Sequence, residues 1–251
     1  MSCNNFRKND HQVTSKKFIK NFNKRDLIKE LKNYLDNLIY YYIVETVGYV
    51  KDKFVQKGTG PNLEGNLITL CTCKHVMRTY PDIEKGTWIA GFTSKNAYNK
   101  GQSSEGNYLF YLFRINEALK NQHEYSLYLK ENFKRTYNYK NSVKNTYGDL
   151  YIINNKKLIE SDDNFYDPEF YLSPGEQHGH FKNKKGESIW HQDIKKVNVK
   201  NWGRSNEKGH KLLIGEKNKS FVWEKPVLKI KKLLTQGQSK TNIEEFLRML
   251  Q

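Results

Sequence analysis

The chain has 251 residues, with 43 lysines and arginines against 27 aspartates and glutamates and a formal net charge of +16. This length is sufficient to bury a substantial core, and the charge favours nucleic acid, nucleotides or an acidic membrane surface as partners. Because only 7 of the basic residues are arginine, a lysine-rich composition explains the charge as well as a dedicated phosphate-binding surface does. Three cysteines and the lack of a long apolar run exclude a disulfide framework and a membrane span, so we expect a cytoplasmic protein.

The first part of the chain is predicted to be a basic arm followed by an amphipathic helix. Residues 1–24 are polar and lysine-rich, which is typical of a loosely docked arm. Apolar residues at helical spacing predict a helix over 26–38, and the aromatic and β-branched run 40–45 predicts a strand. We therefore expect an arm and helix over 1–38, a core domain over 39–230 and a C-terminal helix over 231–251.

The core domain combines short apolar runs with long polar connections. The pattern predicts a loop over 51–65, a helix over 123–133, and strands over 67–71, 87–92, 108–115, 211–214 and 220–223. The last helix is predicted to begin at a capping box formed by Thr241 and Glu244. Short strands with few helices indicate an α+β fold, built around a strongly bent mixed sheet or a small β-barrel with flanking helices.

One run of the core carries the groups best suited to hold an anion. The loop Gly60-Pro61-Asn62 leads into an apolar strand that ends in Cys71-Thr72-Cys73-Lys74-His75-Val76-Met77-Arg78. If a helix follows, Lys74 and Arg78 lie one turn apart and hold a phosphate. A thiol beside two cations has a depressed pKa and is a better nucleophile. The alternative is that Cys71 or Cys73 is a small buried hydrophobe, the commonest state of a free cysteine.

A second group of candidate residues lies in a long polar region towards the C-terminus. His178 and His180 are separated by one glycine, and Asp149 lies upstream. Histidines in this pattern are suited to acid–base work near neutral pH, and with a carboxylate they also suit a metal ion. The third interpretation is a surface loop in which the histidines are incidental. Trp190, in polar surroundings, is a candidate for stacking on a base, whereas Trp88 in an apolar strand is predicted to be core.

Several of these motifs together resemble the second nucleotide-modification-associated domain family. Members carry a proline-asparagine loop followed by a cysteine-lysine-x-x-x-arginine run, matched here by Pro61-Asn62 and by Cys73-Lys74 with Arg78. Similar matches are the turn and strand 86–91, the strand 109–119, and Tyr147-Gly148-Asp149. The resemblance covers about residues 40–229. It departs from the family pattern at Thr87, where an aspartate is usual, and at Leu150, where an asparagine is expected.

The resemblance implies a role in systems that modify nucleotides or handle modified bases, including antiphage defence, and by fold analogy a PUA-like barrel. We predict a protein that binds a nucleotide or an exposed base and acts on it. Phosphate contacts are assigned to Lys74 and Arg78, and the reaction to Asp149, His178 and His180; further ligand contacts are assigned to Asn62, Cys73, Tyr147 and Trp190. The alternatives are a reader of modified bases that does no chemistry, and a protein-interaction module whose N-terminal helix binds a partner. The sequence leaves the cofactor undetermined, and no residue is assigned as a metal ligand.

Overall fold

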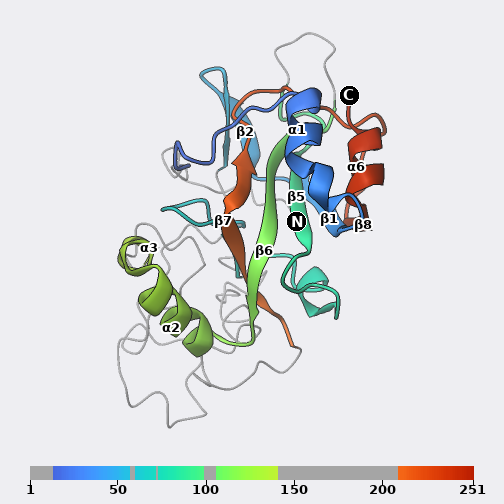
Figure 1. Cartoon of the computed structure of the whole chain (residues 1–251). Helices are drawn as coiled ribbons and strands as arrows, with labels where there is room; N and C mark the ends of the chain where they lie inside the picture. Colours follow the sequence, from blue (N-terminus) through green and yellow to red (C-terminus); the bar gives the residue numbers. More distant parts are fainter. Residues whose placement is uncertain (1–13, 57–59, 72, 99–105, 141–208) are drawn as a thin grey trace, which may run out of the picture. The chain divides into compact units, whose positions relative to one another are not determined.

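The computed structural model describes residues 14–56, 60–71, 73–98, 106–140 and 209–251 (Figure 1). These residues belong to two compact units. Of the described residues, unit 1 contains 60–71, 73–83, 117–140 and 209–214, and unit 2 contains 14–56, 84–98, 106–116 and 215–251. The predictions made for Tyr147, Asp149, His178, His180 and Trp190 lie outside the described residues. Within the described part of the chain, no helix has the length and apolar character needed to cross a membrane.

The strands form a mixed sheet in the order β4-β7-β6-β5-β1-β8 and a separate hairpin of β2 and β3. In the sheet, β1 is parallel to β5 and antiparallel to β8, and β5 is antiparallel to β6. Two strands, β6 (Leu109–Leu119) and β7 (Leu212–Val222), pass through both units. This mixed sheet with flanking helices confirms the predicted α+β class.

Unit 2 contains most of the sheet and two helices that pack side by side (Figure 1). Its elements are α1 (Lys24–Leu31), η1 (Lys32–Tyr34), β1 (Leu38–Val44), β2 (Val47–Val50), β3 (Lys53–Gln56), β5 (Trp88–Thr93), β8 (Gln238–Asn242) and α6 (Ile243–Met249). The core residues come from these helices and from alternate positions of the strands, including Leu27, Trp88, Phe92 and Phe246. The prediction that Trp88 is core is confirmed, since its side chain is fully buried.

Unit 1 contains the short strand β4 (Thr69–Leu70), the turn η2 (Met77–Thr79) and the helices α2 (Gln122–Asn132) and α3 (Lys134–Lys140). Strand β4 pairs with the beginning of β7. A small apolar cluster includes Leu67, Tyr125, Leu129 and Cys71, whose side chain is buried. The interpretation of Cys71 as a small buried hydrophobe is therefore confirmed.

Several element boundaries differ from the sequence-based predictions. Helix α1 ends at Leu31, well before the predicted end at Leu38, because Leu38 already pairs in the sheet with Asn242. The predicted loop over 51–65 contains β3, which turns back on β2 through Lys51 and Asp52, both at positive φ. The cap of α6 is Asn242, whose side chain accepts from the backbone of Glu245, so the predicted capping box at Thr241 is wrong.

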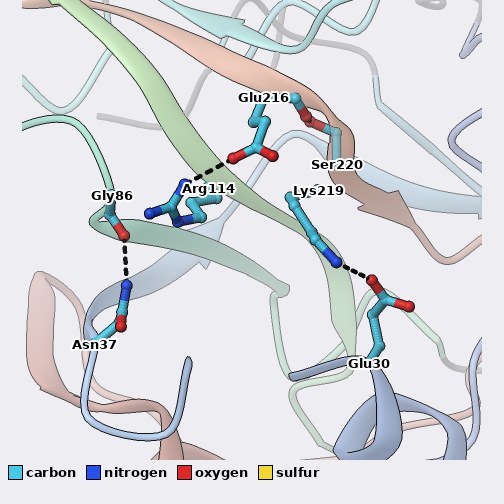
Figure 2. Close-up of polar contacts among 7 residues, drawn as sticks. All are labelled: Glu30, Asn37, Gly86, Arg114, Glu216, Lys219 and Ser220. Atoms are coloured by element: carbon cyan, nitrogen blue, oxygen red, sulfur yellow. Dashed lines mark hydrogen bonds and ion pairs between the residues drawn. The ribbon is translucent and has the colours of Figure 1, made fainter. Parts of the chain in front are cut away.

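Two ion pairs of unit 2 join strand β6 to strand β7 and strand β7 to helix α1 (Figure 2). Arg114 on β6 pairs with Glu216 on β7 at 2.8 Å, and Lys219 on β7 pairs with Glu30 on α1. Both cations lie 5.3 Å from the centre of the Tyr34 ring, a distance at which cation–π attraction adds to the ion pairs. Burial lowers the pKa of Lys219, but the hydrogen bond and charge of Glu30 outweigh it, so the pKa is raised.

Candidate functional site

The loop that carries Asn62 is fixed by hydrogen bonds to the strand that follows it. The backbone of Asn62 exchanges two hydrogen bonds with Thr69, at 2.8 and 3.1 Å. The Asn62 side-chain Oδ1 accepts a hydrogen bond from the backbone of Glu64 at 2.9 Å. Asn62 is 1 % exposed, so its side chain has one defined position beneath the surface.

A buried lysine reaches this loop from the end of α3. The Nζ of Lys140 donates to Asn62 Oδ1 at 2.7 Å and to Thr69 Oγ1 at 3.0 Å. Lys140 is fully buried, and burying an ammonium group is costly unless polar partners replace its water. Here neutral oxygens provide part of that replacement. Lys140 was not predicted as a site residue, because nothing local in the sequence distinguishes it from the other lysines of a basic segment.

A carboxylate is buried in the same loop. Glu64 is 1 % exposed and accepts a hydrogen bond from the hydroxyl of Tyr139 at 3.3 Å. Burial raises the pKa of Tyr139, and the charge and hydrogen bond of Glu64 raise it further. Successive residues of α3, Tyr139 and Lys140, therefore contact Glu64 and Asn62. Helix α3 therefore fixes the loop by contacting two of the loop's side chains, the carboxylate of Glu64 and the amide of Asn62.

The Asn62 loop packs against the turn that contains Cys73. A Cβ atom placed on Gly60 would lie 2.4 Å from the Cβ and 2.6 Å from the Sγ of Cys73, so only glycine fits at this position. The peptide bond between Gly60 and Pro61 is cis. The close approach brings together two of the sequence motifs, the proline-asparagine loop and the cysteine-lysine run.

Arg78 holds that turn from inside. Its side chain is fully buried, with Nε donating to the carbonyl of Cys73 at 2.9 Å and Nη1 donating to the carbonyl of Lys211 at 2.5 Å. Its backbone NH donates to the carbonyl of Lys74 at 3.1 Å. The guanidinium thus links the turn to Lys211, the residue immediately before β7.

Lys74 has an unusual backbone conformation within this turn. It has φ +56°, in the left-handed region that costs a non-glycine residue about 1 kcal/mol or more. The hydrogen bonds of Arg78 on either side of Lys74 hold this conformation. Cys73, Lys74 and His75 are all half-buried, and the Nε2 atom of His75 is buried. Strained backbone that is held in this way is common at ligand-binding sites.

Two histidines meet beside the turn. The rings of His75 and His210 are 5.8 Å apart between centroids and nearly perpendicular, and His210 is 3 % exposed. The residues predicted to carry the reaction were Asp149, His178 and His180 instead. The position of His75 next to Lys74 could have drawn attention to it, but the approach of His210 depends on the fold. In the described part of the chain, no group of three or more histidine, cysteine or acidic side chains is placed to hold a metal ion.

The aromatic side chains that could form a base-stacking cage in unit 2 pack on one another. Tyr98 lies 4.6 Å from Tyr49, 5.6 Å from Tyr108 and 6.3 Å from Phe54, measured between ring centroids. Burial raises the pKa of Tyr108, and the neighbouring Tyr98 raises it further. The edge-to-face contacts among these rings are those of a packed cluster.

The comparison with protein families agrees with these motifs. The family model described as nucleotide modification associated domain 2 matches residues 36–165, which is more than half of the chain. The match includes the Asn62 loop, the Cys73 turn and the whole of α3. No curated protein and no solved structure matches the chain.

Proposed function

Because the chain belongs to the nucleotide modification associated domain 2 family, we propose that it binds a nucleotide or an exposed nucleic-acid base and acts on it. The observation that carries the proposal is the arrangement in unit 1. The half-buried side chains of Cys73, Lys74 and His75 lie on a turn that Arg78 fixes and that packs against Gly60 of the Asn62 loop.

In this proposal Lys74 binds a phosphate group. It is a half-buried cation on a rigid turn, and a fixed cation loses little conformational freedom when it binds an anion. Arg78 contributes to phosphate binding by holding this turn, since its Nε and Nη1 already donate to backbone carbonyls. Cys73 contacts the ligand from the turn, whereas the buried Asn62 contributes by fixing the loop that packs against this turn at Gly60.

The chemical step is proposed to be acid–base chemistry on the base or the sugar. Asp149, His178 and His180 act in it, while Tyr147 and Trp190 contact the base. His75 and His210 are two further candidates, because they bring titratable imidazoles beside Lys74. Because the chain belongs to a family associated with nucleotide modification, we favour this chemical role over a purely structural role for the residues around Lys74.

Nucleotide binding is tested by comparing the native and denatured masses of the purified protein, then titrating a panel of nucleotides and short oligonucleotides. We expect Lys74→Ala to weaken binding about tenfold, the loss of one charge-assisted contact of about 1.4 kcal/mol. The matched control is Lys134→Ala, an exposed lysine at the start of α3 in the same unit. Equal affinities of the two variants, or no binding by the wild type, would overturn the proposal.

The chemical step is tested by product analysis with the ligand that binds. Single replacements of Asp149, His178 and His180 by alanine are expected to lower turnover while affinity changes little. Binding without any product in the wild type would contradict an enzyme and favour a reader of modified bases.

A further inference from the structure

Helix α1 of unit 2 has one face in the core and the opposite face in solvent. Leu27 and Leu31 are fully buried and belong to the apolar core of the unit. On the solvent face, Arg25, Lys29 and Lys32 are exposed. They follow one another at intervals of four and three residues, the spacing of one helix face. Lys32 is the C-cap of α1 and has helical dihedral angles, φ −53° and ψ −30°, so it continues this face. These three residues form a cationic row along α1.

The other charged residues of α1 lie on its flanks. Asp26 and Glu30 each follow a member of the cationic row by one position, a rotation of about 100° around the helix axis. Glu30 pairs with Lys219 of β7. Lys24, at the start of the helix, donates to the backbone carbonyl of Leu250. The helix therefore separates its acidic side chains from the cationic row.

No carboxylate neutralises the cationic row. The helix α6 contacts α1, and its acidic residues Glu244 and Glu245 both pair with Arg248. Asp36, which follows η1, is exposed. Among the described residues, none of the acidic side chains forms an ion pair with a member of the row. Like charges three or four residues apart on a helix repel one another, and an anion bound across the row would relieve this repulsion.

We propose that the cationic row of Arg25, Lys29 and Lys32 binds the phosphate backbone of nucleic acid, in addition to the nucleotide site proposed in unit 1. At a rise of about 1.5 Å per residue, the row is about 10 Å long. The phosphates of one strand of B-DNA are spaced about 3.4 Å along the axis, so the row matches a run of three to four phosphates. Each contact releases a condensed counterion and positions the protein without reading the base sequence.

The small apolar content of this face favours nucleic acid over a protein or a membrane. Ile28 lies between the cations and is 43 % exposed. The centre of a protein–protein interface is apolar and depleted of charged residues, and binding at a membrane surface requires an apolar helix face. One isoleucine among three cations provides neither. Interfaces with DNA are more polar and much more positively charged, which agrees with this face of α1.

The test is the affinity of the full chain for fluorescently labelled single-stranded and duplex DNA of about 20 nucleotides, measured at several salt concentrations. The variant combines Arg25→Gln, Lys29→Gln and Lys32→Gln, because glutamine has a helix propensity close to that of lysine and arginine. The same proteins are titrated with polyglutamate and with vesicles of anionic lipid.

The control variant removes the same net charge from exposed positions of unit 2 outside α1. It carries glutamine in place of Lys51, Lys95 and Lys225. The melting temperatures of both variants verify that the fold is kept.

We expect the variant of the cationic row to bind DNA at least about tenfold more weakly and to lose about 2 to 3 units of the slope of log affinity against log salt. The control is expected to change affinity less than about twofold and to keep the slope. Equal losses in the two variants would show a general effect of net charge and overturn the proposal. The absence of DNA binding by the wild type, or a loss confined to polyglutamate or to the vesicles, would also overturn it.

Discussion

The two units bury different kinds of side chain. In unit 2, the described core is apolar and aromatic, and the ion pairs formed by Arg114 and Lys219 are partly exposed. In unit 1, the described residues include a guanidinium, an ammonium and a carboxylate that are almost fully buried, at Arg78, Lys140 and Glu64. Burying charge is costly and is a poor way to gain stability. The difference indicates that apolar packing stabilises the described part of unit 2, whereas buried polar side chains fix the loops of unit 1.

The largest expected effect is at Arg78. The Arg78→Met variant leaves the carbonyls of Cys73 and Lys211 without their donor, and we expect a loss of about 3 kcal/mol or more in the free energy of unfolding. Arg135→Met, at an exposed position on α3, is the control and should change stability by less than about 0.5 kcal/mol. Urea unfolding of both variants measures the difference. Similar values would mean that the buried guanidinium is not essential to unit 1.

The packing of unit 2 is tested at Gly91, which faces Tyr111 on the neighbouring strand. A Cβ atom at position 91 would lie 2.1 Å from Cε1 of the fully buried Tyr111 ring. We expect Gly91→Ala to cost about 2 to 3 kcal/mol through overpacking. In the control Gly106→Ala, the new methyl group meets only the flexible end of Lys229, so the cost should be below about 1 kcal/mol. Equal costs would show that the sheet accommodates the methyl group at position 91.

A smaller effect is expected for the partly exposed pair of Lys219 and Glu30. A double-mutant cycle with Lys219→Met and Glu30→Gln should give a coupling free energy of about 1 kcal/mol or less, reduced by high salt. Because the pKa of Lys219 is raised in the folded protein, the pair contributes fully to stability below the pKa that Lys219 has in the unfolded chain. This contribution is lost as pH rises through the pKa of Lys219 in the folded protein. A coupling as large as the effect at Arg78 would contradict the contrast between the units.

The smallest effect is expected at Tyr139, a residue that is 43 % exposed. Tyr139→Phe removes the hydrogen bond to Glu64 and should cost about 0.5 kcal/mol near neutral pH, after allowance for solvent screening. Because the folded pKa of Tyr139 is raised, its contribution is present below the unfolded pKa and is lost as pH rises through the folded one. Melting temperatures of the two proteins should therefore converge above about pH 10. A gap that widens at high pH would contradict this assignment.

Much of the fold was predictable because its signal is local. The apolar runs at β1, β5 and β6 and the amphipathic spacing of α1 appear in consecutive residues. The motif residues Pro61, Asn62, Cys73, Lys74 and Arg78 indicated the family that the comparison confirmed over residues 36–165. The local pattern failed at β8, a polar strand that is defined by its pairing with β1 rather than by its own residues.

The sequence by itself determined the class of fold, the family and the motifs that could hold an anion, because these depend on residue type and short-range spacing. Only the tertiary structure decided which motifs meet. It brought Lys140 to Asn62 and His210 to His75 across long separations in the chain, and it turned Arg78 inward onto two carbonyls. Such contacts depend on long-range chain closure and burial, and the spacing of residues along the chain carries no signal for them.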